Sequence, residues 1–450
     1  MEIQMENTPS ICIQLLINNI TSYLSGNVCK NSSIVKVNNE NLAINGELYF
    51  LPSLKVWKSV LKGTDKCDEK CTTILQHCLH IRDGQTNNNT DADTANQVLQ
   101  LLIASSSSWS IKLEKCFLEK ERIFLFLQRT PLIENSIKAA ITFKHDFGKT
   151  FSLKKVFSLK SLQDKESELT TTRLYLIQCV TEKILNLHGY SVSNEYPDYK
   201  FVFTSKSQGS VEENYERCIC GVVKNTETNC KETKLTWQEY ISNKIKELKT
   251  LNEHKYFETE KCNVKAQDCF LENIAKATAM FELLSVKPTR SVFIGCNFAT
   301  DKNTTNTKGA CAPFILYNTA RITAIIEKYN DKRLKGEYPN LPHINDIDFS
   351  LLNQEEEWEL IYNFVIGYQQ MIKDCLKHDS VFQINPQVIC IFLAKLCQKF
   401  SIYYRRIRIL TEVYDHLIPT MSVRLYMLHA LQIVLQNALG LLDILPVSRM

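Results

Sequence analysis

The stretch GACAPFILYNTARI, residues 309–322, decides how the C-terminal third of this 450-residue chain folds. Small residues lead into Pro313, and aromatic and aliphatic residues follow it. Proline is favoured in the first turn of a helix, because its φ is preset and that turn needs no N–H from it. Apolar residues then recur at helical spacing to about Lys328. The stretch is therefore predicted to begin a helix and not to be a catalytic loop, since Cys311 has no histidine near it in sequence.

Further helices are expected downstream. Pro339 and Pro342 mark a loop, and the acidic run 355–357 suits the positive end of the next helix dipole. Pro386 is predicted to start a long helix that reaches about Leu410. A last helix, after a proline at 419, has a leucine-rich core of Leu425, Leu428, Leu431, Leu435, Leu439 and Leu442. Residues 305–450 are thus predicted to form an all-α bundle.

The chain before residue 305 alternates strand and helix signals. The runs KFVFT (200–204) and SVFIG (291–295) predict buried strands, and residues 174–187 have helical apolar spacing. This order predicts an open parallel sheet covered by helices. Residues 84–96 are polar and are expected to be a loop. Three domains follow: an α+β module at 1–130, an α/β domain at 131–304 and the helical domain at 305–450.

Composition narrows the classes of function. The net charge is +4 at pH 7 and there is no histone-like arm, so any contact with a polyanion must come from a local patch. The N-terminus has no basic start followed by an apolar run, and the 17 cysteines follow no repeated spacing. We therefore expect reduced thiols and a cytoplasmic protein. We find no apolar run long enough to span a bilayer, so no membrane contact is expected.

One cluster contains possible zinc ligands: Cys67, Cys71, His77, Cys78 and His80. Its spacing is not the paired C-x-x-C of a structural zinc site, and no second pair lies at the right distance. Packed thiols are the favoured interpretation. No metal and no other cofactor is predicted.

The long helix after Pro386 is expected to carry a basic and aromatic end. At about 100° per residue, one arc holds the core residues Ile389, Phe392, Leu396, Phe400, Tyr403 and Ile407. A neighbouring arc holds Lys395, Lys399 and Arg406, whereas Arg405 and Arg408 lie on other sides and Tyr404 stands apart from the core. Guanidinium groups bind phosphate by paired hydrogen bonds, and aromatic rings stack on unpaired bases. A solvated basic face with a tyrosine at its rim explains the same residues, so both interpretations stay open.

The stretch 309–322 resembles the start of the DALR anticodon-binding domain of arginyl-tRNA synthetases, in which Gly-x-x-Ala-Pro leads into an aromatic residue, a tyrosine and Ala-Arg-Ile. The resemblance continues through Glu357-Trp358 and the terminal leucine-rich helix. It implies a tRNA-binding helical domain. The tRNA-facing candidates that it implies are Phe314, Tyr317, Arg321, Tyr403, Tyr404, Arg406 and Met450, to which the helix projection adds Lys395, Lys399, Arg405 and Arg408.

Residues 168–192 resemble the first helix of the synthetase catalytic domain, with Arg173 matching an arginine after its signature. In an active synthetase this helix begins with His-x-Gly-His, which contacts ATP. Here those positions are Glu168, Leu169, Thr170 and Thr171. Residues 224–232 do not match the second, Lys/Ser-rich signature. The resemblance therefore implies a degenerate class I synthetase-like Rossmann region with no catalytic residues.

Taken together, these features are similar to the DALR anticodon-binding domain-containing protein 3 family. That resemblance implies an RNA-binding adaptor, not an enzyme, that recognises arginine tRNAs. It also implies a partner, a tRNA 3-methylcytidine methyltransferase acting in the anticodon loop. Two alternatives are kept: a divergent active arginyl-tRNA synthetase, and a protein scaffold whose basic helix docks an acidic partner without RNA contact.

Overall fold

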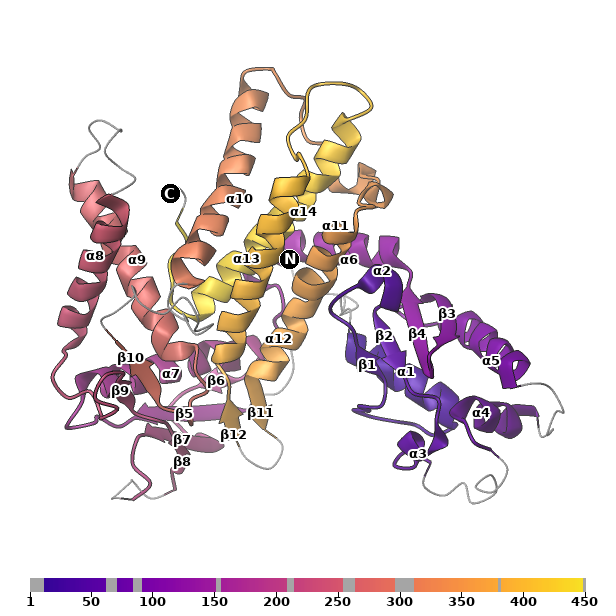
Figure 1. Ribbon diagram of the computed structural model, residues 1–450, viewed down its shortest axis with the longest axis horizontal. Helices are drawn as coiled ribbons and strands as arrows, with labels where there is room; N and C mark the ends of the chain where they lie inside the picture. Colours follow the sequence, from indigo (N-terminus) through magenta and orange to yellow (C-terminus); the bar gives the residue numbers. More distant parts are fainter. Residues whose placement is uncertain are drawn as a thin grey trace. The chain divides into compact units, whose positions relative to one another are not determined.

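The computed structural model describes residues 12–61, 71–83, 91–150, 155–208, 214–253, 264–295, 311–378 and 382–447 (Figure 1). The chain forms two compact units. Unit 1 contains Met1–Ala139 and Asp348–Asn363, and unit 2 contains Ala140–Ile347 and Phe364–Met450. The division of the sequence into three domains at residues 130 and 304 stays a prediction.

Unit 1 is built on a four-stranded antiparallel sheet in the order β1-β2-β4-β3. Its strands are β1 (Lys36–Val37), β2 (Leu48–Phe50), β3 (Leu113–Glu119) and β4 (Arg122–Leu127). The apolar side chains of residues 123–127 in β4 are buried. Its helices are α1 (Ile13–Ser25), α2 (Leu42–Asn45), α3 (Leu54–Trp57), α4 (Ile74–Asp83), α5 (Asp91–Ser106) and most of α6 (Arg129–Phe143).

Helix α5 corrects the expectation of a loop at 84–96. Residues 91–96 are helical, whereas 84–90 lie outside the described residues. The polar residues at the start of α5 precede an apolar stripe of Ala95, Val98, Leu99 and Leu102. These four residues recur at helical spacing and are all buried, which explains why the helix begins within the polar run.

A segment from late in the chain, 348–363, completes unit 1. Its helix α11 (Glu355–Leu360) carries Trp358, whose Nε1 donates to Glu47 Oε1 at 2.7 Å. Arg129 pairs with Glu47 at 3.0 Å and with the carboxylate of the first residue of α11 at 2.7 Å. The Glu47 side chain is fully buried, and this burial raises its pKa although the donors around it oppose the rise. A buried carboxylate is tolerated only with such partners, so this network holds the late segment in unit 1.

Replacing Trp358 with phenylalanine is expected to lower the free energy of unfolding of unit 1 by about 1.5–3 kcal/mol, because the ring stays while the hydrogen bond to a buried carboxylate is lost. Faster hydrogen exchange of the β4 amides would report this loss. The matched control is Trp109→Phe, since Trp109 packs edge-on against Tyr23 without a bond to a carboxylate. Equal exchange in the two variants would contradict the role given to the Trp358 hydrogen bond.

Unit 2 contains the expected parallel sheet, in the order β6-β5-β7-β8. Its strands are β5 (Val156–Ser161), β6 (Ser191–Val192), β7 (Tyr199–Thr204) and β8 (Glu216–Ile219). A second parallel pair joins β9 (Val223–Asn225) to β10 (Val292–Ile294). Helix α7 (Glu168–Leu187) packs on the larger sheet, and α8 (Trp237–Glu253) packs on α9 (Val264–Leu284). The predicted α/β arrangement is confirmed.

The C-terminal helices of unit 2 lie side by side in Figure 1. They are α10 (Cys311–Leu334), α12 (Gly367–Cys375), α13 (Gln387–Arg406) and α14 (Ile418–Leu441), and a six-residue π-helical segment (Ile361–Ile366) precedes α12. The leucines predicted for the core of the last helix are all buried. The prediction of an all-α region missed one hairpin, β11 (Leu376–His378) with β12 (Phe382–Ile384). Its Phe382 stacks on Phe201 of β7, with the ring centroids 3.9 Å apart.

Helix α14 corrects a second expectation. Among the described residues it is long and apolar enough to cross a membrane by length and composition, although no such run was expected. Of its most apolar window, 56% is buried inside the protein. Core helices of soluble proteins pass the same test, so this one helix is weak evidence for a membrane contact.

Candidate functional site

Helices α10 and α13 bring three of the predicted residues together. The guanidinium carbon of Arg321 lies 4.4 Å from the ring centroid of Tyr317 and 4.5 Å from that of Tyr404. Arg321 Nη2 also donates to the Tyr317 hydroxyl at 2.7 Å. We call Tyr317, Arg321 and Tyr404 the Arg321 stack. It presents two rings and one cation from helices that are far apart in the sequence.

The rings of the Arg321 stack are accessible. Tyr317 is 43% exposed, Tyr404 is 40% exposed, and Phe314, one turn earlier on α10, is 39% exposed. Asn318 and Thr319 are buried and donate to carbonyls of the preceding turn of α10, and Asn318 Oδ1 also accepts from Arg321 Nη1 at 3.5 Å. The helix therefore turns one face to the core and holds its aromatic face toward solvent.

Helix α13 separates the predicted lysines from the Arg321 stack. At about 100° per residue, Lys395, Lys399 and Arg406 lie about 140–180° around the helix from Tyr404. They flank the side on which Phe392 contacts Phe364, with ring centroids 5.4 Å apart, whereas Tyr404 lies toward α10. The predicted set is thus divided between two flanks of one helix.

Three predictions at the end of α13 need correction or comment. Tyr403 is fully buried, so its side chain belongs to the core and cannot stack on a base. The helix ends at Arg406 and not near residue 410, because Ile407 is extended, with φ −116° and ψ 121°. Arg408 therefore lies beyond the helix, where its Nε donates to a backbone carbonyl. Arg405 is exposed, and Met450 lies outside the described residues.

The first turn of α7 is capped by the protein itself. Ser167 Oγ accepts from the backbone N–H and the hydroxyl of Thr170, and Thr170 Oγ1 accepts from Val223 N at 3.1 Å. Leu169 is buried, and a Glu168 carboxylate oxygen accepts from the backbone N–H of Trp237 at 3.0 Å. The four positions of the altered signature are therefore used for packing and capping.

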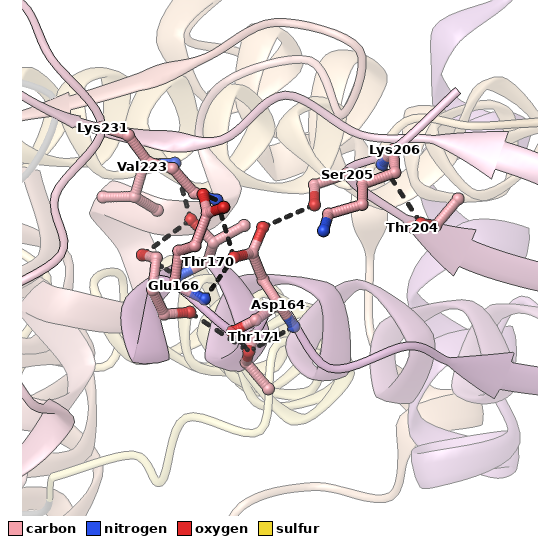
Figure 2. A network of polar contacts seen from close by, with 10 residues as sticks. Asp164, Glu166, Thr170, Thr171, Thr204, Ser205, Lys206, Val223 and Lys231 are labelled. Carbon is pink, nitrogen blue, oxygen red and sulfur yellow. Dashed lines mark hydrogen bonds and ion pairs between the residues drawn. The ribbon is translucent and has the colours of Figure 1, made fainter. Parts of the chain in front are cut away.

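Figure 2 shows an ion-pair network in front of this turn. Lys231 Nζ lies 2.7 Å from Asp164 and 2.8 Å from Glu166, and Ser205 Oγ donates to Asp164 at 2.6 Å. Thr171 Oγ1 accepts from the backbone N–H of Asp164 at 2.8 Å. The Lys231 hydrogen bonds hold the pKa of Asp164 below its usual range despite burial, and also lower that of Glu166. The Lys231 ammonium group is therefore shared by two carboxylates, and Lys206 also lowers the pKa of Glu166.

Replacing Lys231 with methionine is expected to lower the free energy of unfolding at neutral pH. The contribution of Lys231 should be fully present between about pH 5 and pH 10. The folded-state pKa values of Asp164 and Glu166 are depressed, so their contribution is lost as the pH falls through those values. Urea midpoints of the two proteins should therefore converge below about pH 4. A difference that persists unchanged to low pH would contradict the ion-pair role, and the exposed Lys120→Met is the control.

Arg173 is an anchor whose role the sequence did not reveal. Its side chain is fully buried and donates to the carbonyls of Leu283 at 3.1 Å, of Arg290 at 2.9 Å and of Gly221. Longer bonds reach the carbonyls of residues 286 and 287. Burial lowers the pKa of Arg173 to about 10, which leaves it charged at neutral pH. One guanidinium thus ties α7 to the end of α9 and to the starts of β9 and β10.

Two cysteines of unit 2 and the possible metal ligands of the described residues bear on thiol and metal chemistry. Burial raises the pKa of Cys218 to about 12 and that of Cys220 to about 11, so both are protonated at neutral pH and poor nucleophiles. Within the described ranges no group of three or more histidine, cysteine or acidic side chains could hold a metal ion. Of the possible zinc ligands weighed from the sequence, Cys67 lies outside those ranges.

Sequence comparisons give matches concentrated in the C-terminal part. Residues 315–450 match the DALR anticodon binding domain. The protein called DALR anticodon-binding domain-containing protein 3 from Rattus norvegicus is 32% identical over 180 residues, 39% of this chain and 32% of the rat protein. The Danio rerio protein of the same name is 29% identical over 238 residues, 52% of this chain and 41% of the fish protein. The matched parts thus span less than half the length of these relatives.

A solved structure, the arginyl-tRNA synthetase of Plasmodium falciparum, aligns over 100% of both chains with a TM-score of 0.59 and 9% sequence identity. At this identity the likeness shows the fold alone. It confirms the expected combination of a synthetase-like α/β region with C-terminal helices.

Proposed function

Since residues 315–450 are a DALR anticodon-binding domain, we propose that this protein is a tRNA-binding adaptor that contacts the anticodon arm through the Arg321 stack. The single observation that carries the proposal is the pair of exposed tyrosine rings whose centroids lie 4.4 and 4.5 Å from the Arg321 guanidinium carbon. Unpaired bases of an anticodon loop stack on aromatic rings and on guanidinium planes. Phe314 extends the same surface by one helical turn.

The preferred tRNAs are arginine isoacceptors in this proposal. Its support is the resemblance of residues 309–322 to the DALR domain of arginyl-tRNA synthetases, together with the match of residues 315–450 to the DALR anticodon binding domain. The lysines on the other flank of α13 would contact the phosphate backbone of the same tRNA without reading its bases.

The adaptor does not activate arginine in this proposal. The support comes from the first turn of α7, where threonine and glutamate replace the histidines of the signature and Lys231 is already paired with two carboxylates. The histidine donors of that signature are therefore replaced at these positions. An active arginyl-tRNA synthetase of divergent type is the alternative.

We further propose that the adaptor partners a tRNA 3-methylcytidine methyltransferase that acts in the anticodon loop. Its support is the resemblance of residues 336–352 and 355–364 to the DALR anticodon-binding domain-containing protein 3 family, to which two curated relatives also point. The proposed compartment is the cytoplasm, which suits the reduced thiols expected from the 17 cysteines of the sequence.

The test crosslinks the purified chain to total tRNA and sequences the bound fraction. Enrichment of arginine tRNAs, together with an absence of arginine-dependent ATP–pyrophosphate exchange, is the expected result. Exchange activity would establish the synthetase alternative instead. A bound fraction with the composition of total tRNA would overturn the proposed selectivity, and an absence of bound RNA would leave a protein scaffold. Co-purification with 3-methylcytidine-forming activity tests the methyltransferase partner.

A further inference from the structure

A groove of about 490 Å³ opens in unit 2 at the start of β10. Its volume is in the range of small-molecule sites. Seven residues line it: Ser285, Val286, Lys287, Arg290, Ser291, Phe293 and Gln387. They come from the loop between α9 and β10, from β10 and from the first turn of α13. None of them belongs to the network of Figure 2, so the groove is separate from the altered signature at α7.

The groove is electropositive. Its lining contains Lys287 and Arg290, both exposed, and no acidic side chain. The buried guanidinium of Arg173 donates to the backbone carbonyls of residues 286, 287 and 290, all three of which belong to the groove lining. Because carbonyl oxygens are neutral acceptors, they do not cancel the positive charge of Arg173. Lys224, the register partner of Phe293, adds a fourth cation, with its Nζ 5.7 Å from the Phe293 ring centroid. Concave surfaces with one sign of charge concentrate ions of the other sign, so the groove favours an anion.

One wall of the groove is aromatic. Phe293 lies on the short β9–β10 pair and is 54% exposed, although it is a large apolar side chain. In the first turn of α13, Gln387 Oε1 is buried and has no hydrogen-bond partner among the described residues, while its Nε2 donates to Asn385. Buried polar atoms are normally satisfied. The groove therefore offers a flat ring and two exposed cationic side chains, and the Gln387 amide oxygen lies buried beside it.

We propose that this groove binds one unpaired nucleotide of an RNA strand. The base stacks on Phe293, and the phosphate lies between Lys287 and Arg290. An anion alone would not require the exposed ring, and an apolar ligand would not require the cations. The inference rests on the proposed RNA-binding function and extends the contact beyond the Arg321 stack.

The test uses the full chain and three probes: fluorescein-labelled hexauridylate, a labelled anticodon stem-loop, and free UMP as competitor. Phe293→Ala is expected to weaken hexauridylate binding by about tenfold or more, because stacking on an aromatic ring is lost. Arg290→Glu is expected to weaken it similarly and to reduce its salt dependence. Phe293→Tyr keeps a ring and should keep the affinity, which guards against an effect of misfolding.

Matched controls separate this groove from the Arg321 stack. Tyr196→Ala removes another exposed ring, and Lys120→Glu reverses an exposed charge in unit 1. Both should leave hexauridylate binding unchanged, and the groove variants should leave stem-loop binding within about twofold. Arg321→Ala should weaken stem-loop binding and leave hexauridylate binding unchanged. If Arg321→Ala leaves stem-loop binding unchanged while the groove variants weaken hexauridylate binding as expected, the proposed function is wrong and the groove proposal stands.

Two results would overturn the groove proposal. The first is hexauridylate binding that is absent, or that stays unchanged in both Phe293→Ala and Arg290→Glu. The second is competition by free UMP at the same concentration as by unlabelled hexauridylate, which would identify a pocket for mononucleotides and not for an RNA strand.

Discussion

Arg321→Ala is expected to weaken binding of an arginine tRNA by about tenfold to a hundredfold, with the fold retained. The lost contacts are base stacking and paired hydrogen bonding by a guanidinium, each worth about 1–3 kcal/mol, and about 1.4 kcal/mol corresponds to tenfold. The stability cost should be smaller, because exposed cation–π contacts contribute about 0.5–1 kcal/mol each. Filter binding at fixed salt gives the affinity, and thermal unfolding gives the stability.

Arg321→Lys distinguishes stacking from charge. Lysine keeps the positive charge but cannot present a flat donor surface between Tyr317 and Tyr404. Its affinity should therefore be closer to that of the alanine variant than to that of the unchanged protein. Full affinity in Arg321→Lys would mean that only charge matters, and full affinity in Arg321→Ala would remove the Arg321 stack from the interface.

The lysines of α13 provide a matched comparison. A Lys395→Ala, Lys399→Ala double variant changes the other flank of the helix. It should weaken binding of all tRNAs about equally and reduce the salt slope by roughly one per lost phosphate contact. The Arg321 variants, in contrast, should alter discrimination between tRNAs. If the double variant alone reduces selectivity, the bases are read on the α12 side and the proposed surface is misplaced.

Arg173→Met is expected to lower the free energy of unfolding of unit 2 by about 4 kcal/mol. Methionine fills similar volume, but it leaves the buried carbonyls of Gly221, Leu283 and Arg290 without their donor, at about 1–3 kcal/mol for each unsatisfied group before relaxation. Pulse proteolysis in urea, with fragments assigned to each unit, measures the loss. Unit 1 should be unaffected.

Two variants sharpen the Arg173 result. Arg173→Lys should recover only part of the stability, because an ammonium group has three donors and cannot reproduce the planar fork. Arg290→Met removes an exposed guanidinium nearby and should change the stability by no more than about 0.5 kcal/mol. A small loss in Arg173→Met, similar to that in Arg290→Met, would show that the carbonyl contacts are not what holds α7 to β9 and β10.

Local patterns predicted much of the fold. The Pro313 start of α10, the leucine core of α14 and the strands at 200–204 and 292–294 are all present in the structure, although Phe293 in the second strand is exposed and not buried as predicted. Helical periodicity and apolar runs depend on neighbours within a few residues, so a single sequence reports them. Predictions were poorest where a local pattern was weak, as in the polar first turns of α5, and where a helix ended without a glycine or proline, as at Arg406.

The sequence by itself determined the type and order of most elements, though not the β11–β12 hairpin or the first turns of α5. It also determined the altered signature at 168–171 and the residue types of a surface that suits RNA. Only the tertiary structure decided which of these residues meet. It moved 348–363 into unit 1 through Glu47, buried Tyr403, joined Arg321 to Tyr404 and left the lysines of α13 on the other flank. The physical reason is that these outcomes depend on burial and on pairing between residues distant in the chain, where a hydrogen bond or a stacked ring is stabilising only once the rest of the core has brought its partner within reach.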